Sequence, residues 1–115
     1  MFVKVLKSKL HRAAVTDANL NYTGSITIAE DLAEAAGLRK YERVLVANIN
    51  NGTRHETYVQ IGEPGSGVIC LNGAAARLAC IGDRVIIMSF GYYNPDEEIP
   101  APKIVRLNEK NQIES

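Results

Sequence analysis

The chain has 115 residues, of which 46% are hydrophobic and 23% are charged, and its 13 basic residues balance its 13 acidic ones. These values are ordinary for a single domain over 1–115, and the zero net charge argues against nucleic-acid or membrane-surface partners. No apolar run is long enough to span a bilayer, and lysines interrupt the apolar N-terminal residues, so we expect a cytoplasmic protein. The two cysteines lack the spacing of a metal site, and we expect no bound metal.

The predicted elements are short strands separated by turns. Runs of β-branched and apolar residues predict strands at 2–6, 10–16, 22–28, 43–49, 54–61, 68–71, 84–90 and 103–107. Short helices are expected over 28–36 and 72–76, and a flexible tail over about 108–115. The strand at 84–90 should lie at the centre of the core and the one at 103–107 at an edge. This pattern indicates a mostly β protein folded as a compact β-barrel.

Local motifs predict how several elements begin and end. Thr27 and Glu30 fit a capping box at the start of the first helix, which Gly37 should end. Asn51-Gly52 predicts a type I′ hairpin turn between two strands. Asn72 is expected to cap the second, shorter helix.

Three segments carry functional information beyond a generic β-barrel. They are Lys9-Leu-His-Arg12 with Tyr22-Thr-Gly-Ser25, Asn51-Gly-Thr-Arg54 with Thr57-Tyr58, and Asn72-Gly-Ala-Ala-Ala76. In this order and spacing they resemble the pyruvoyl-dependent aspartate 1-decarboxylases of the pantothenate pathway, from Met1 to about Glu98. The resemblance implies a double-psi β-barrel with two or more short helices. It also implies a homotetramer with active sites at subunit interfaces, and leaves room for a maturation factor.

The Gly24–Ser25 step explains how such a protein obtains an electron sink without pyridoxal phosphate. Ser25 Oγ attacks the Gly24 carbonyl, the peptide bond becomes an ester, and elimination leaves dehydroalanine, which hydrolyses to a pyruvoyl group and ammonia. We expect glycine here because it leaves the carbonyl open and tolerates unusual backbone angles. By resemblance, the chain is thereby divided into a β chain, 1–24, and an α chain, 25–115. The covalent pyruvoyl group is then the only cofactor.

The resemblance also assigns roles to individual residues in converting L-aspartate to β-alanine. Ser25, as the pyruvoyl group, forms the Schiff base, and Tyr58 donates a proton to Cα. Lys9 and Arg54 bind the two carboxylates, for which a lysine point charge and a guanidinium fork are suited. Processing depends on Gly24, Ser25, Thr57 and Asn72, and the substrate pocket also includes Thr57, Asn72, Gly73, Ala74 and Ala75. His11 and Tyr22 have supporting roles.

These residues also have structural interpretations. Lys9 could be a solvated strand charge, Arg54 a surface residue beside a turn, and Tyr58 a half-buried strand aromatic. On a regular strand, residues 54 and 58 share a face that 57 does not, which conflicts with a single pocket unless a bulge or a subunit boundary intervenes.

Two other functions are open. A serine hydrolase could use Ser25 with His11 or His55, although the sequence lacks a nucleophile-elbow pattern. A non-enzymatic β-barrel interaction module is the second, although zero net charge and the lack of Trp disfavour nucleic-acid binding.

Overall fold

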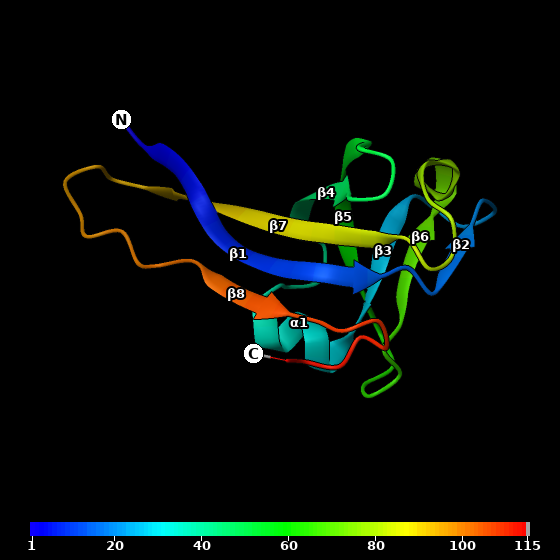
Figure 1. Ribbon diagram of the computed structural model, residues 1–115. Coiled ribbons are helices and arrows are strands. Elements are labelled where there is room, and N and C mark those ends of the chain that lie inside the picture. The colour runs from blue at the N-terminus through cyan, green and yellow to red at the C-terminus, as the bar shows by residue number, and fades with distance from the viewer. Residues whose placement is uncertain (115) are drawn as a thin grey trace.

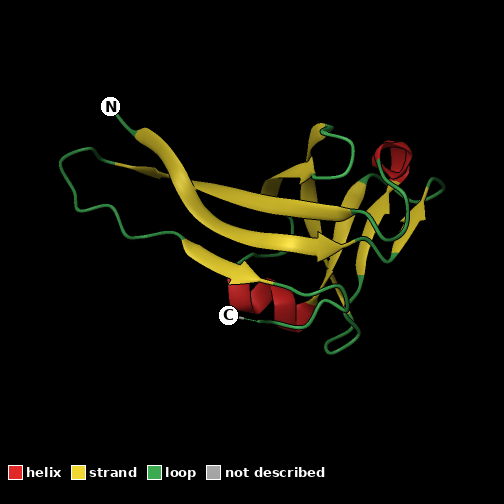
Figure 2. Ribbon diagram, viewed as in Figure 1, coloured by secondary structure: helices red, strands yellow, loops and turns green. Residues whose placement is uncertain are grey.

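The computed structural model describes residues 1–114 and contains one eight-stranded sheet with two short helices (Figures 1 and 2). The strands are β1 (Val3–Ala14), β2 (Asp17–Asn19), β3 (Ser25–Ala29), β4 (Arg43–Asn48), β5 (Arg54–Gly62), β6 (Ile69–Asn72), β7 (Arg84–Tyr93) and β8 (Lys103–Arg106). The helices are α1 (Glu30–Ala36) and the 3₁₀ helix η1 (Gly73–Leu78). The predicted mostly β class with short helices is confirmed. Neither helix is long and apolar enough to cross a membrane.

The order of strands in the sheet, β2-β6-β3-β5-β4-β7-β1-β8, differs strongly from their order in the chain. Parallel pairs form between β1 and β8, β2 and β6, and β3 and β5. A hairpin cannot join parallel neighbours, so crossover connections link these pairs, as expected for a double-psi β-barrel. β1 and β7 extend beyond the barrel as a long two-stranded arm that carries the N-terminus (Figure 1).

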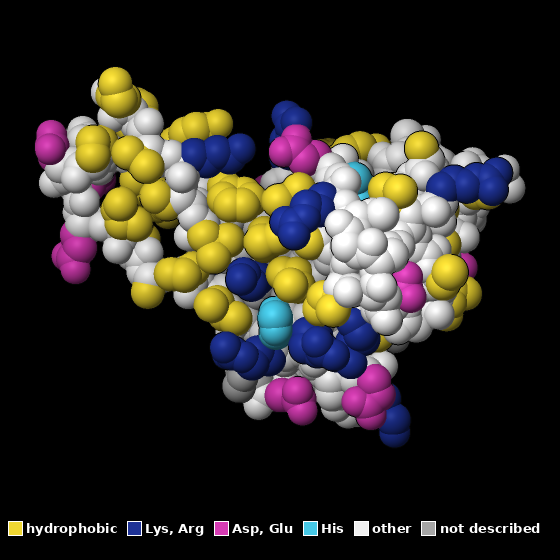
Figure 3. All heavy atoms as spheres, turned by 45° about the horizontal axis from the view of Figure 1, so that its top comes forward, with side chains coloured by type: hydrophobic (Ala, Val, Ile, Leu, Met, Phe, Trp, Pro, Cys, Tyr) yellow, Lys and Arg dark blue, Asp and Glu magenta, His cyan; other side chains and the backbone are white. Residues whose placement is uncertain are grey.

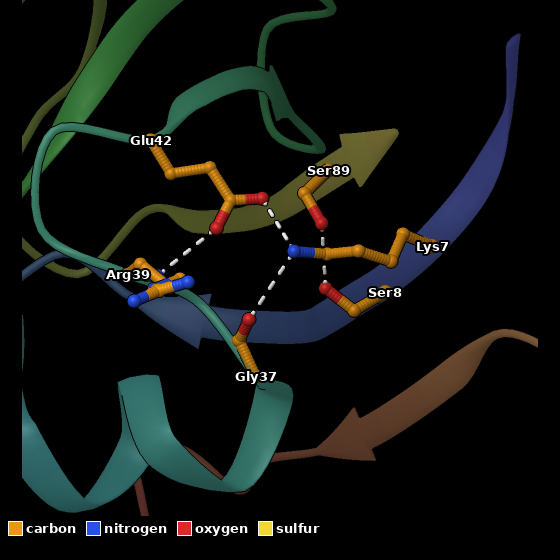
Figure 4. Close-up of polar contacts among 6 residues, drawn as sticks. All are labelled: Lys7, Ser8, Gly37, Arg39, Glu42 and Ser89. Atoms are coloured by element: carbon orange, nitrogen blue, oxygen red, sulfur yellow. Dashed lines mark hydrogen bonds and ion pairs between the residues drawn. The ribbon is translucent and has the colours of Figure 1, made fainter. Parts of the chain in front are cut away.

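β1 is one strand where the sequence predicted two, because β-bulges interrupt its alternation. Its pairing with β7 shifts register between Leu6 and Ser8 and again between Leu10 and Ala13. A bulge breaks the period of two that identifies a strand in the sequence. Ser8 thereby faces the interior, where its hydroxyl lies 2.8 Å from that of Ser89 on β7 (Figure 4).

One partly buried lysine joins β1 to the segment between α1 and β4. Lys7 Nζ lies 2.6 Å from the carboxylate of Glu42 and donates to the carbonyl of Gly37 at 3.3 Å (Figure 4). Gly37 ends α1 in the left-handed conformation, with φ 69°, as predicted.

Neither predicted N-cap side chain makes a capping hydrogen bond, for one shared reason. The N-cap residue of α1 is Ala29 and not Thr27, and Asn72 stands at the N-cap position of η1 without a side-chain capping bond. The side chain of Thr27 is instead paired with that of Asn72 at 3.0 Å. These polar groups bind each other across the sheet, and a local motif cannot show this alternative.

The β4–β5 connection also differs from its prediction. A type I′ turn needs positive φ at both central residues, and only Gly52 has it, at 74°. Instead, Asn51 Oδ1 accepts from the backbone N–H of Thr53 at 2.9 Å, and Asn51 Nδ2 donates to the carbonyl of Leu78 at 2.8 Å. The loop is therefore wider than expected and is attached to η1.

Two predictions concern the C-terminal strands. β8 is an edge strand, as predicted, and pairs only with β1 among the described strands. β7 contributes Val85 and Ile87 to the core, where both are fully buried, but the alternate residues are only half buried. β7 is therefore a one-sided strand of the sheet and not the continuously buried strand that its composition predicted.

The C-terminal segment, which the sequence predicted as a flexible tail, folds back in a turn closed by a bridge between Leu107 and Ile113, and Asn111 is its buried residue. The side chain of Asn111 is buried, and its Oδ1 accepts from the N–H of Ala14 at 2.7 Å. Its Nδ2 donates to the carbonyls of Ala14 and Gly67, each at 2.8 Å. One amide thus completes the backbone hydrogen bonding at the end of β1, where the sheet supplies no further strand.

We expect Asn111→Ala to lower the free energy of unfolding by about 1–3 kcal/mol, because it leaves the buried N–H of Ala14 without an acceptor. Urea denaturation in the Ser25→Ala background, which prevents the expected backbone cleavage, measures the change. Gln112→Ala, at an exposed neighbour, should change it by less than about 0.5 kcal/mol. Equal values for the two variants would contradict an anchoring role for Asn111.

Candidate active site

The antiparallel pairing of β3 with β6 forms the centre of the site. Ser25 lies opposite Asn72, and Thr27 lies opposite Cys70. Cross-strand partners share a face of a sheet, as do residues two apart on one strand, so these four side chains form one polar patch. The patch comprises two residues from each strand.

Hydrogen bonds join the members of this patch. Asn72 Nδ2 donates to Ser25 Oγ at 2.9 Å and to Thr27 Oγ1 at 3.0 Å. The Cys70 thiol donates to Asn72 Oδ1 at 3.2 Å, and the Ser25 hydroxyl makes a longer contact of 3.4 Å to the Thr23 carbonyl. Ser25 and Asn72 are each only 3% exposed. The Ser25 oxygen is therefore held by a neutral amide donor inside the protein.

Gly73, and not Gly24, carries the strict requirement for glycine at this site. Gly73 has φ 69°, and a Cβ there would lie 2.7 Å from the Cα of Gly24 and 3.0 Å from the carbonyl oxygen of Tyr22. Gly24 has no positive φ, and a Cβ there would meet only the carbonyl oxygen of Asn72 at 3.9 Å. Gly24 therefore does not use the left-handed backbone angles that glycine tolerates. Gly73 instead allows η1 to pack directly on the predicted scissile step.

Two cavities adjoin this step. The Ser25 cavity is lined by residues including Tyr22, Ser25, Thr27, Tyr58, Gln60 and Asn72. The Gly24 cavity is lined by residues including Gly24, Thr57, Tyr58, Asn72, Ala74 and Ala75. Tyr58 and Asn72 line both. The structure therefore brings together most of the predicted site residues, from β3, β5, β6 and η1.

The register of β5 explains how Thr57 and Tyr58 reach the same region from opposite faces. β5 runs parallel to β3 with Ile26 beside Val59, so that Tyr58 lies level with Ser25, the first residue of β3. Thr57 comes before that point and has no β3 neighbour beside it. Both faces of β5 therefore open toward the Gly24 cavity, so Thr57 and Tyr58 share it without a bulge, whereas Arg54 is not one of its lining residues.

Lys9 and His11 lie apart from Ser25 within the chain. Both are on β1, and neither is among the residues that line the Ser25 or Gly24 cavity. Burial, followed by the charges of Lys9, Arg106 and other nearby cations, lowers the pKa of His11. Figure 3 shows lysine and arginine side chains gathered around a histidine on this surface. The chain thus holds a basic cluster and the Ser25 cavity in different places.

Arg54 is exposed at the beginning of β5, where it pairs with Ala47 of β4. It is not among the residues that line the Ser25 or Gly24 cavity. Within one chain, therefore, neither of the two cationic residues predicted to bind the substrate carboxylates lines a cavity wall.

His55 lines the Gly24 cavity, and its Nε2 is buried without a hydrogen-bond partner among residues 1–114. Burial lowers the pKa of His55, so the imidazole is neutral at neutral pH. The hydrogen-bond partners of Ser25 Oγ are Asn72 and Thr23, and neither histidine is one of them. The histidine–serine contact that a serine hydrolase uses is absent from the described residues. Nor do residues 1–114 contain a group of three or more acidic, His or Cys side chains that could hold a metal ion.

Two members of the polar patch, Thr27 and Cys70, were not identified from the sequence. The available signal was their spacing, since each lies two residues from a predicted site residue, Ser25 or Asn72, on a predicted strand. That spacing becomes informative only when β3 is known to pair with β6 in this register.

Comparison with known proteins gives one consistent family. The family model described as "Aspartate decarboxylase" matches residues 1–114. The aspartate 1-decarboxylase of Kosmotoga olearia is 64% identical over 112 residues, which cover 97% of this chain and 96% of that protein. That of Caldicellulosiruptor saccharolyticus is 60% identical over 114 residues, which cover 98% and 89%. Among solved structures, the rationally designed mkDPBB_sym1 protein gives a TM-score of 0.48 at 19% identity, covering 74% of this chain and 96% of that one.

We expect Gly73→Ala to destabilise the Ser25→Ala chain by at least about 1–3 kcal/mol, because the new Cβ forces a left-handed backbone and overlaps Gly24. Gly24→Ala, in the same background, should cost less than about 1 kcal/mol, because its Cβ has room. Urea denaturation compares the two. A larger loss for Gly24→Ala would show that the steric requirement was assigned to the wrong glycine.

Proposed function

The chain belongs to the aspartate decarboxylase family, and from that premise we propose that it converts L-aspartate to β-alanine and CO₂ with a pyruvoyl group made from its own Ser25. The observation that carries the proposal is the buried hydrogen bond from Asn72 Nδ2 to Ser25 Oγ, directly beside Gly24. The β-alanine formed would supply pantothenate biosynthesis.

Self-processing requires the Ser25 hydroxyl to act as a nucleophile without a neighbouring histidine. Its proton makes only a long contact to Thr23, and the Asn72 N–H points at its oxygen. That donor stabilises negative charge on Oγ as Oγ attacks the Gly24 carbonyl carbon, and the hydroxyl proton passes to the Ser25 nitrogen as the Gly24–Ser25 C–N bond breaks and the ester forms. Thr57 lines the cavity beside Gly24, and we assign its hydroxyl to the oxyanion that forms on the Gly24 carbonyl oxygen.

The residues present fit a ketone at position 25. The site is buried, its amide donor would face an acceptor, and charged side chains do not line the Ser25 cavity. When present, the pyruvoyl group supplies the electron sink for loss of CO₂. Tyr58 lines both cavities, and we assign its phenol to the delivery of a proton to the substrate Cα. Ala74 and Ala75, with small side chains, leave room for a ligand beside the main chain.

Aspartate carries two carboxylates, and the cavity of one chain lacks the cations to bind them. We therefore propose a homotetramer in which Lys9 and His11 of one protomer reach the Ser25 cavity of another. Arg54 would bind a substrate carboxylate at the rim of that cavity. The projecting arm supports assembly, because Phe2 and Tyr92 are 67% and 70% exposed there. Figure 3 shows hydrophobic side chains collected on this end of the molecule. Exposed apolar surface of this kind marks contact with another protein.

The purified protein should release β-alanine from L-aspartate, and Ser25→Ala should abolish the release because no ketone can form. Amino-acid analysis of the reaction mixture measures it. Ser66→Ala, at an exposed serine in the β5–β6 turn, should keep wild-type activity. Activity retained by Ser25→Ala would exclude a role for that hydroxyl.

Mixed oligomers test the shared site. Lys9→Ala and Ser25→Ala should each be inactive alone, whereas protomers of the two variants assembled together at a 1:1 ratio should regain about a quarter of wild-type activity. Recovery is expected because some cavities then combine an intact Ser25 with an intact Lys9 from the neighbour. If both residues serve the same protomer's site, the mixture will show no recovery.

A further inference from the structure

We infer that Cys70 is a positioning residue for Ser25, because its thiol fixes the orientation of the Asn72 side-chain amide. The inference rests on the proposed function, since it concerns the self-processing of the Gly24–Ser25 bond. It adds to that reaction a side chain that contacts neither Gly24 nor Ser25 in the hydrogen-bond network.

The geometry is a short buried chain of hydrogen bonds. Cys70 and Asn72 lie two apart on β6 and therefore point to the same face, where the thiol donates to Asn72 Oδ1 at 3.2 Å. On its other side, the same amide donates from Nδ2 to Ser25 Oγ and Thr27 Oγ1. Cys70 is 7% exposed and Asn72 is 3% exposed, so water does not readily replace the thiol as the partner of Asn72 Oδ1.

The orientation of an asparagine amide depends on its hydrogen-bond partners, because rotation by 180° exchanges oxygen and nitrogen with little change in shape. The partners on β3 are hydroxyls, which can donate or accept and so tolerate both orientations. Cys70 favours one orientation of the amide, because a thiol donates to a carbonyl oxygen but its sulfur is a weak acceptor for an N–H. Burial raises the pKa of the Cys70 thiol, so it stays protonated and remains a donor.

The orientation decides whether the amide helps or hinders nucleophilic attack. With Nδ2 toward β3, an N–H faces the Ser25 oxygen as it becomes negative. In the rotated orientation the carbonyl oxygen of the amide would face the same atom and repel the developing charge. A donor aimed at developing charge is a large contribution to such reactions. The thiol therefore acts on the reaction through Asn72.

Cys70 variants that differ in donor and volume test this role. Cys70→Ser keeps a donor, Cys70→Val keeps volume without a donor, and Cys70→Ala removes both. The readout is the rate at which fragment 25–115 appears after cell-free synthesis of the whole chain. Loss of the donor should slow cleavage about three- to tenfold in both the Val and Ala variants, whereas Ser should stay within about twofold of wild type.

Several controls separate positioning from packing. Cys80→Ala, at the exposed cysteine, should cleave at the wild-type rate. The melting temperatures of all Cys70 variants, measured in the Ser25→Ala background, should rank the variants in a different order from their cleavage rates. The inference is overturned if Ala and Val cleave as fast as wild type, or if Ser is as slow as Val. A wild-type chain that stays uncut would instead overturn the proposed function itself.

Discussion

The register between β3 and β6 is the constraint on which the site depends. The two strands alternate in step, so that Ile26 faces Leu71 and Ile28 faces Ile69 on the core side, and all four are at most 1% exposed. The intervening residues then fall on the other face, where Ser25 meets Asn72. A slip of either strand by one residue would turn its two apolar side chains out of the core, so hydrophobic burial fixes the position of the proposed nucleophile.

The site separates two tasks that need different chemistry. The groups in the hydrogen-bond network that includes Ser25 are neutral: an amide, a thiol, hydroxyls and a backbone carbonyl. Such groups suit attack on the protein's own backbone, because no buried charge has to be compensated. Binding a substrate with two carboxylates needs cations, and the basic cluster that includes Lys9 lies on β1, away from this cavity. Under the proposed function, processing would use groups of one chain, while substrate binding would use cations of a second.

Sequence patterns located most of the elements, and a family resemblance supplied the candidate site residues, but neither showed how these parts meet. Alternation and turn residues predicted the strands, and Gly37 the end of α1, because these signals are local. The segments around Ser25, Tyr58 and Asn72 were identified together, but only through their resemblance to a family. Side chains of Asn and Thr were misassigned, because both can bind a local backbone group or a distant partner and the partner depends on strand register. For the same reason, Asn111 gave no sign that it anchors the C-terminal segment.

The mass of freshly purified protein tests the central account most directly. The account predicts two fragments, 1–24 and 25–115, with the second lighter by one ammonia than the same fragment beginning with serine, because Ser25 has become a ketone. An intact 115-residue chain that still forms β-alanine would contradict the account, as would an active fragment 25–115 that retains its serine.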